Sequence, residues 1–312
     1  TNTIALFDIT GGKVTIKNVV FDGIKGGAVV RTVGTEFAMD NVTAQNCEHT
    51  QQQGLFRLLG KNTITNSTFK NNKCSMVMTI NYDGNSDTPQ VVDNCLFEGN
   101  TVNGTAALYY VKGASFALTN SEFVDNTVNC SSNGATIYLG FTENNVVTGN
   151  LFENNTVIDA STSTRVAGAI FFGYEAEVSG NAFVNNTASN ANGDALGQVC
   201  TSTYYDCTID LGGNYWGDGE APVYGKDYTL QHQTGEATFA LNSYYTVRDT
   251  DENGNVVLSD KVEINNVAKV GKFGYASLQA AIDAAQAGDT ITLLADISGE
   301  AEATAGKDQY LI

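Results

Sequence analysis

One short pattern recurs along the first 216 residues and constrains the fold more than any other feature. Clear copies are "ITNSTFKNN", "LTNSEFVDNT", "VTGNLFENNT" and "VSGNAFVNNT". The aromatic residue of the pattern falls at Phe21, Phe69, Phe97, Phe123, Phe152 and Phe183, with Ala44 in its place in the second repeat and Trp216 in a last, altered one. Successive spacings range from 23 residues, between Phe21 and Ala44, to 33, between Phe183 and Trp216. A drifting period of this length is typical of a solenoid whose loops vary.

Asparagines recur at fixed places beside the aromatic residue. They follow it by three residues at Asn72, Asn100, Asn126, Asn155 and Asn186. Others precede it by two or three residues, at Asn18, Asn41, Asn66, Asn94, Asn120, Asn150 and Asn181. Asparagine tolerates left-handed backbone angles, and its amide can bond to an identical amide one turn away. We therefore predict a structural ladder of the first five asparagines, with the phenylalanines stacked inside.

A second phrase alternates with the first and reads as β-strand. Its copies are apolar runs led by glycine, "GGAVV", "GLFRL", "GATIYL" and "GAIFFG". Helical periodicity is absent from this region, and no repeat can bury its apolar side chains alone. Stacking the repeats about 4.8 Å apart would pair every strand with its counterpart above and below. The sequence predicts an all-β, right-handed parallel β-helix of about seven to eight turns over residues 1–228.

Residues 229–267 are predicted to form a β-hairpin segment, because alternating strands flank Asn253-Gly254. The same stretch also fits the spacing of a calcium-binding loop, with the ligands Asp249, Asp251, Asn253, Asn255 and Asp260. Such a loop requires helices on both flanks, and these flanks read as strands. Calcium is the one cofactor for which the sequence gives any indication, and it stays an alternative to a simple hairpin.

Residues 268–312 are predicted to form a helix-strand segment. Leu278, Ala281, Ile282 and Ala285 share one helical face, Ser277 is a plausible N-cap, and Gly288 ends the helix. The strand "TITLLADI" follows. We expect either a lid on the β-helix or the start of a further module.

Two further sites carry alternative interpretations. Tyr215 and Trp216 would form a stacking platform for a sugar, or Trp216 would plug the open end of the solenoid. Cys200 and Cys207 flank a loop that a disulfide would close, and Cys47 and Cys74 take nearly matching places in neighbouring repeats. Six cysteines allow fifteen pairings, and the sequence does not choose among them.

Charge and hydropathy exclude two classes of partner. The net charge of −18 disfavours nucleic acid and anionic membrane surfaces. No run of eighteen apolar residues appears, so no membrane insertion of this segment is predicted. The opening "TNTIALFDIT" lacks a signal-peptide pattern. We expect a fragment of a larger exported protein whose export signal and anchor lie outside this chain.

The "N-x-x-F-x-x-N" repeats, the closing "GNYWGDGEAP" and the segment "YASLQAAIDAAQAGDTITLLADI" together resemble one family. They are similar to pectate-lyase-like β-helix modules of adhesin-like surface proteins from anaerobic, often gut-dwelling, bacteria. The resemblance covers residues 1–228 and 268–297. It implies an extracellular or cell-surface location and adhesion to a glycan or to a host or bacterial surface protein. For activity it implies little, since one fold hosts many functions.

The residues themselves give little indication of catalysis. Lyases similar to this fold use an arginine base beside a calcium site, and the hydrolases use clustered acids. The four arginines are Arg31, Arg57, Arg165 and Arg248, and none falls one repeat from an acidic pair. Stacking would bring Glu98, Asp125 and Glu153 near one another. His49, in a polar loop, and His232, beyond the β-helix, are not placed to serve each other.

We therefore name no catalytic residue and predict a non-catalytic adhesin-like or stalk module. The alternative is a polysaccharide-active lyase or glycoside hydrolase, or a carbohydrate-binding β-helix.

Overall fold

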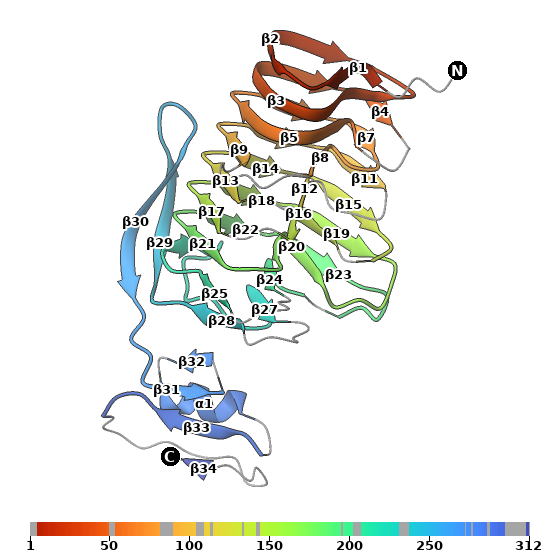
Figure 1. The fold of residues 1–312 in the computed structure, drawn as a ribbon. Coiled ribbons are helices and arrows are strands. Elements are labelled where there is room, and N and C mark those ends of the chain that lie inside the picture. The colour runs from red at the N-terminus through yellow and green to blue at the C-terminus, as the bar shows by residue number, and fades with distance from the viewer. Residues whose placement is uncertain are drawn as a thin grey trace.

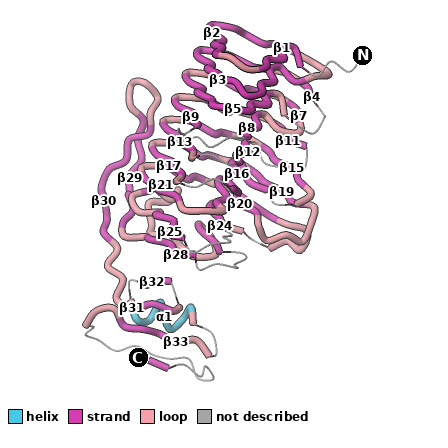
Figure 2. The backbone as a smooth tube through the Cα atoms, viewed as in Figure 1, coloured by secondary structure: helices cyan, strands magenta, loops and turns pink. Residues whose placement is uncertain are grey.

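The chain winds into a parallel β-helix, followed by a long hairpin and a small separate unit (Figure 1). The computed structural model describes residues 5–49, 54–81, 90–103, 109–112, 115–132, 134–141, 144–194, 196–201, 207–230, 237–271, 273–275, 277–285, 288–296 and 310–311. Strands dominate, and among these residues the one helix is α1 (Leu278–Ala284) (Figure 2).

Short strands joined by tight turns make up each coil of the β-helix. The first coil has β1 (Ala5–Thr10) and β2 (Lys13–Asp22), the second β3 (Ala28–Gln45) and β4 (Glu48–His49), and the third β5 (Phe56–Thr65), β6 (Thr68–Lys70) and β7 (Lys73–Cys74). The next two have β8 (Met78–Asn81), β9 (Gln90–Asp93), β10 (Leu96–Glu98) and β11 (Thr101–Asn103), then β12 (Tyr109–Lys112), β13 (Phe116–Thr119), β14 (Glu122–Val124) and β15 (Thr127–Cys130). Two more have β16 (Gly134–Phe141), β17 (Asn145–Thr148), β18 (Leu151–Glu153) and β19 (Thr156–Asp159), then β20 (Val166–Phe172), β21 (Ala176–Ser179), β22 (Ala182–Val184) and β23 (Thr187–Ser189).

Each strand pairs in parallel with its counterparts in the neighbouring coils. The strands β4, β7, β11, β15, β19 and β23 form a six-stranded sheet, and most of the others belong to a 24-stranded sheet. Six coils therefore carry strands in both sheets, with partial coils before and after them. The predicted all-β parallel β-helix is confirmed.

Parallel pairing continues past residue 228. After β24 (Val199–Thr201), β25 (Cys207–Asp210) and β26 (Asn214–Tyr215), a last coil of β27 (Tyr228–Leu230), β28 (Ala237–Ala240) and β29 (Ser243–Thr250) pairs with them strand by strand. The stretch "GDGEAPVYGKD" that interrupts the sequence rhythm is a loop between two coils. The β-helix thus extends to β29, beyond the boundary expected at residue 228.

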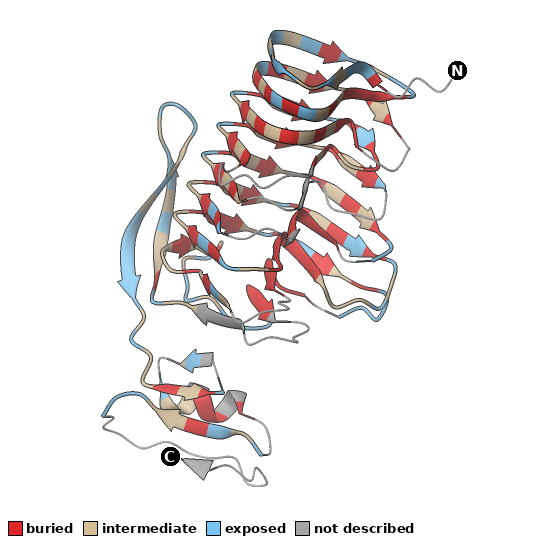
Figure 3. Ribbon diagram, viewed as in Figure 1, coloured by how far each residue is buried: buried red, intermediate tan, exposed pale blue. Residues whose placement is uncertain are grey.

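An aromatic column fills the interior of the β-helix. Along the strands, buried residues alternate with intermediate and exposed ones (Figure 3). Phe69, Phe97, Phe123, Phe152 and Phe183 stack with ring centroids 4.6–5.2 Å apart. Ala44 leaves a gap in this column, and Phe56 of β5 fills it, 6.5 Å from Phe21 and 5.3 Å from Phe69. Trp216 continues the column, 4.9 Å from Phe183.

The predicted asparagine ladder is present and fully buried. The side-chain nitrogen and the backbone N–H of each ladder asparagine donate to the side-chain oxygen of the next, through Asn72, Asn100, Asn126, Asn155 and Asn186. The same side-chain nitrogen also donates to a carbonyl of the preceding coil, such as that of Phe97 for Asn126. These contacts satisfy backbone groups that a tight turn would otherwise leave buried and unpaired.

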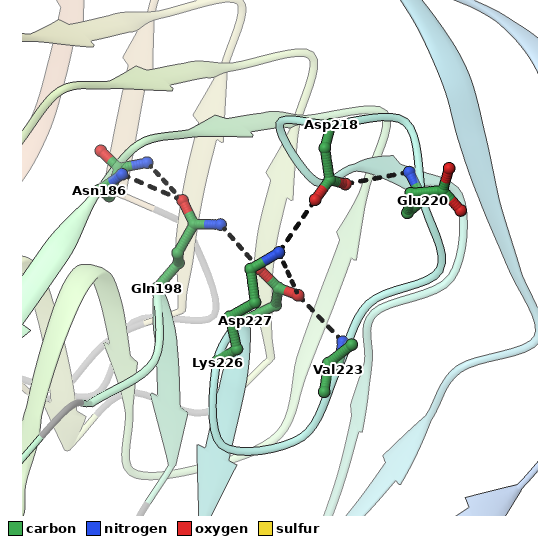
Figure 4. Close-up of polar contacts among 7 residues, drawn as sticks. All are labelled: Asn186, Gln198, Asp218, Glu220, Val223, Lys226 and Asp227. Carbon is green, nitrogen blue, oxygen red and sulfur yellow. Dashed lines mark hydrogen bonds and ion pairs between the residues drawn. The ribbon is translucent and has the colours of Figure 1, made fainter. Parts of the chain in front are cut away.

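The ladder ends on a buried carboxylate (Figure 4). Both nitrogens of Asn186 donate to Gln198 Oε1, and Gln198 Nε2 donates to Asp227 Oδ1 at 3.1 Å. Asp227 Oδ2 accepts the Val223 N–H at 2.9 Å. Burial raises the pKa of Asp227 above its usual range. The amide chain therefore ends at Asp227, whose two carboxyl oxygens accept the Gln198 side-chain N–H and the Val223 backbone N–H.

The sequence predicted that one asparagine would provide both the left-handed backbone angle and the ladder hydrogen bond. In the structure, two adjacent residues share these roles. Positive φ occurs one position before the ladder asparagine, at Asn71, Gly99, Asp125, Asn154 and Asn185. A second column with positive φ lies three residues before the aromatic position, at Asn18, Asn41, Asn66, Asn94 and Asn120. The ladder asparagines themselves do not adopt positive φ. The turn therefore needs one residue for its backbone angle and another for the amide bond.

The hairpin and the C-terminal segment follow the last coil. Strand β30 (Val256–Glu263) pairs antiparallel with β29, so the chain turns back on itself around Asn253-Gly254. The remaining strands β31 (Ala268–Val270), β32 (Phe273–Tyr275), β33 (Thr290–Leu293) and β34 (Tyr310–Leu311) form a separate sheet. Ala281, Ile282 and Ala285 of the predicted helical face pack with Ala268 and Ile291 in a core of their own.

Candidate functional site

A polar groove lies where the β-helix meets the base of the hairpin. Its volume is about 380 Å³. The lining includes Thr148, Ser179, Asp210 and Asn242 from four successive coils, and Tyr245 and Lys261 from the two strands of the hairpin. Volumes of this size are common for small-molecule sites.

The groove follows the outer column of left-handed residues, at the point where that column changes from asparagine to glycine. The side chain of Asn41 bonds to Asn18, and that of Asn94 to Asn66. Gly149, Gly180 and Gly213 take the same position in later coils, with φ of 71°, 68° and 69°. Both residue types tolerate this backbone, but only glycine leaves the surface open.

Polar groups in the groove are oriented by short-range hydrogen bonds. Asp210 Oδ1 accepts the Gly212 N–H at 2.9 Å, and Asn242 Oδ1 accepts the Ser243 hydroxyl at 3.1 Å. Lys261 Nζ lies 2.8 Å from Glu263 Oε1, and this partner raises the pKa of the lysine. Lys261 thus has an acidic partner on its own strand, whereas the Asp210 carboxylate belongs to the groove.

Trp216 does not form a sugar platform. It is buried to 1% exposure between Phe183 and Tyr228. Tyr215 is half-buried, and its hydroxyl donates to the carbonyl of Gly217 at 2.8 Å. The indole is an interior ring of the column, because Trp216 directly follows β26 and continues the alternation of buried Asn214 and half-buried Tyr215.

The five residues of the proposed calcium loop do not converge. The Asp251 carboxylate accepts both backbone N–H groups of Asn253 and Asn255 across the hairpin turn, and Asp249 accepts the N–H of Thr250. Asp260 lies on β30, four residues beyond Val256, which pairs with Thr250 next to the turn. At about 3.3 Å per residue, Asp260 is about 13 Å along the strand from that pair. In the described part of the chain, no three His, Cys, Asp or Glu side chains gather as metal ligands would.

No disulfide links any two of the six cysteines, all of which the structure describes. The suggested Cys200–Cys207 bridge is not formed, and neither is the alternative between Cys47 and Cys74. Burial raises the pKa of Cys95 and of Cys130 to about 12. These thiols act as small apolar core residues.

Three glutamates gather on the outer face beneath the hairpin. Glu122 lies in register between Leu96 and Leu151, and burial raises its pKa, with Glu153 and Glu98 adding to the effect. Arg248 of the hairpin opposes that shift and lies 3.5 Å from Glu153. A Cβ added to Gly254, at the hairpin tip, would be 3.8 Å from Glu122 Oε1. Stacking thus brings Glu98, Glu122 and Glu153 close enough to raise the pKa of Glu122.

Five ion pairs link charged side chains of neighbouring coils. The pairs are Arg31–Asp8 at 2.7 Å, Lys13–Glu36 at 2.9 Å, Lys17–Asp40 at 3.2 Å, Lys25–Glu48 at 3.4 Å and Lys70–Glu98 at 2.7 Å. His49, expected in a polar loop, is buried in β4 opposite Cys74, and burial lowers its pKa. His232 lies outside the described residues.

Sequence reasoning missed the groove and its residues Asp210, Asn242, Tyr245 and Lys261. A signal was present in the aligned repeats, because the residue three before the aromatic changes from asparagine to glycine at Gly149. The hairpin that forms the other wall was predicted, but its position against the coils was not.

Comparison with known proteins defines the family. Residues 5–183, more than half of the chain, match the family model described as a right-handed β-helix region. No curated protein and no solved structure matches the chain. The helix α1 is too short to span a bilayer, and the described residues contain no other helix. The chain belongs to the right-handed β-helix family.

Proposed function

We propose that this chain is a non-catalytic, extracellular module of a bacterial cell-surface protein, acting as an adhesin-like or stalk unit. The observation that carries the proposal is that basic side chains of the β-helix form ion pairs with acidic side chains of neighbouring coils. Arg31, Lys17 and Lys70 are engaged in ion pairs between coils. These three cations thus link neighbouring coils, which favours a supporting role for them over a catalytic one.

The architecture supports the same function. A continuous amide ladder and an aromatic column give a rod in which every coil is fixed to its neighbours. The polar groove at the base of the hairpin provides a recognition surface on that rod. Its partner would be a glycan or a protein of a host or bacterial surface.

Glu122 favours a second candidate, a polysaccharide-active enzyme. A carboxyl group with a raised pKa beside other carboxylates is the pattern of a general acid in glycoside hydrolysis. The hairpin lies over this group, and Arg248 engages its neighbour Glu153.

Incubation with neutral and uronic-acid polysaccharides separates the two candidates. The non-catalytic module is expected to release neither reducing ends nor unsaturated products. Turnover that disappears in Glu122→Gln would contradict the proposal and establish the enzyme. For the location, antibodies against this chain should label intact source cells, and labelling that appears only after permeabilisation would count against a surface protein.

A further inference from the structure

The geometry points to the groove at the hairpin base as a binding site for an uncharged saccharide, and we propose this ligand class for it. The inference rests on the proposed function, because it names the ligand of the non-catalytic module. It concerns the surface formed by Thr148, Ser179, Asp210, Asn242, Tyr245 and Lys261.

The exchange of asparagine for glycine creates the space. Asparagine serves the left-handed position in five earlier coils, so the backbone does not demand glycine in the later ones. A Cβ at Gly180 would meet nothing closer than Thr148 Oγ1, at 3.4 Å. A side chain therefore fits there. Its absence leaves room beside Gly180 that the five earlier coils with asparagine at this position do not have.

An aromatic ring forms one wall of this space. The edge of the Tyr245 ring lies 3.7 Å from where a Cβ of Gly213 would be. Sugars present apolar C–H faces as well as hydroxyl groups, and a half-buried tyrosine offers both an apolar ring and a polar tip. A ring beside a floor of glycines is suited to a flat, hydroxyl-rich ligand.

The polar groups of the groove favour an uncharged ligand over an anionic one. The hydroxyls of Thr148 and Ser179 and the amide of Asn242 can donate and accept hydrogen bonds with sugar hydroxyls. Asp210 accepts only, and it would repel a carboxylate or sulfate. Lys261, the one cation in the lining, is paired with Glu263. With a net charge of −18 on the chain, an uncharged saccharide is favoured over a uronic-acid polymer.

Filling the groove without disturbing the fold is the decisive test. Gly180→Asn places in this column the residue that five other coils already carry there, at a φ that asparagine tolerates. Asn66→Gly makes the reverse exchange away from the groove and is the matched control. Binding of neutral glucan, mannan and galactan oligosaccharides, and of oligogalacturonate, is measured by calorimetry, with circular dichroism as the check on folding.

We expect at least one neutral oligosaccharide to bind and oligogalacturonate not to bind. Gly180→Asn should abolish this binding, and Asn66→Gly should leave it unchanged. Tyr245→Ala should weaken it about tenfold, with Val247→Ala on the same strand as its control. Asp210→Asn, which retains an acceptor for the Gly212 N–H, should relax the exclusion of oligogalacturonate.

Three outcomes would overturn the site. They are binding that persists in Gly180→Asn, a preference of the wild type for oligogalacturonate, and no binding of any oligosaccharide in the panel. None of these requires catalysis, so the module could still be a surface unit with a different ligand. Cleavage of a bound oligosaccharide would instead contradict the proposed function, whichever residues bind it.

Discussion

Each inner ladder asparagine forms several hydrogen bonds that nothing else in the turn can replace. Asn126 donates to Asn155 and to the carbonyl of Phe97, and it accepts from both nitrogens of Asn100. We predict that Asn126→Ala lowers the free energy of unfolding by about 2–3 kcal/mol, because it leaves buried donors and acceptors unpaired.

Asn129→Ala is the control for this change, measured by urea denaturation. Its amide bonds to Asn103 at the surface, so a loss of about 0.5 kcal/mol or less is expected. Equal losses of unfolding free energy in the two variants would show that the buried ladder contributes no more to stability than a surface amide pair.

The aromatic column tolerates an alanine at one level because a ring from another strand occupies the space. Phe56 reaches the gap beside Ala44. We predict that Phe56→Ala costs about 3–5 kcal/mol, as expected for a buried phenylalanine. The double variant Ala44→Phe/Phe56→Ala should recover part of that loss in denaturant titrations, since the new ring would continue the stack. No recovery would mean that Phe56 acts mainly through other contacts of β5.

The buried thiols provide a chemical test of the core. Cys95 and Cys130, each with a pKa of about 12, should not react with iodoacetamide in the folded protein at pH 8, because only the thiolate is nucleophilic. Unfolding in denaturant should expose all six cysteines. An intact mass lower by two hydrogen atoms before reduction than after it would reveal a disulfide and contradict the structure, in which no two cysteines are linked.

At the scale of elements, the hairpin β29–β30 is the feature that joins the stack to the candidate site. It supplies Tyr245 and Lys261 to the groove and Arg248 to the glutamates of the outer face. Arg248 lowers the pKa of Glu122, in opposition to burial. We predict that Arg248→Met raises the pKa of Glu122 further, as followed by NMR titration of the carboxyl carbons.

Lys261→Met, on the partner strand of the hairpin, is the control for this titration. Its ammonium group pairs with Glu263, so the pKa of Glu122 should not change. A pKa of Glu122 that is the same with and without Arg248 would show that the hairpin does not rest on this face in solution.

At the scale of the whole molecule, carboxylates that bridge the coils govern the response to acid. Asn46 holds the pKa of Asp22 below its usual range, Asn66 does the same for Asp40, and Lys13 for Glu36. A folded-state pKa below the unfolded one contributes stability that is present above the unfolded pKa and is lost as the pH falls. Stability should therefore fall below about pH 4.

Thermal melts across this pH range are the measurement for the acid response. The raised pKa of Asp227 works in the opposite direction. As the pH falls, protonation of this carboxylate removes the free-energy cost of burying its charge. Asp22→Asn/Asp40→Asn should flatten the dependence between pH 5 and pH 3. A melting temperature that rises steadily on acidification would contradict the bridging role.

The sequence by itself determined the stack of parallel coils, the rings that face inward and the residues of the ladder. These follow from local chemistry, because strand alternation, turn angles and amide pairing are properties of residue types repeated at matching positions. Phe97, Phe123 and Phe152 meet because each occupies the same place in its coil.

Contacts between different columns were decided only by the tertiary structure. That Phe56 fills the gap at Ala44, that β29 continues the β-helix, and that the hairpin lies against Glu122 and Glu153 depend on distances between residues far apart in the sequence. The loss of a side chain at Gly180 is visible in the sequence. It becomes a groove only because Tyr245 and Lys261 form the opposite wall, and no local preference specifies where that wall lies.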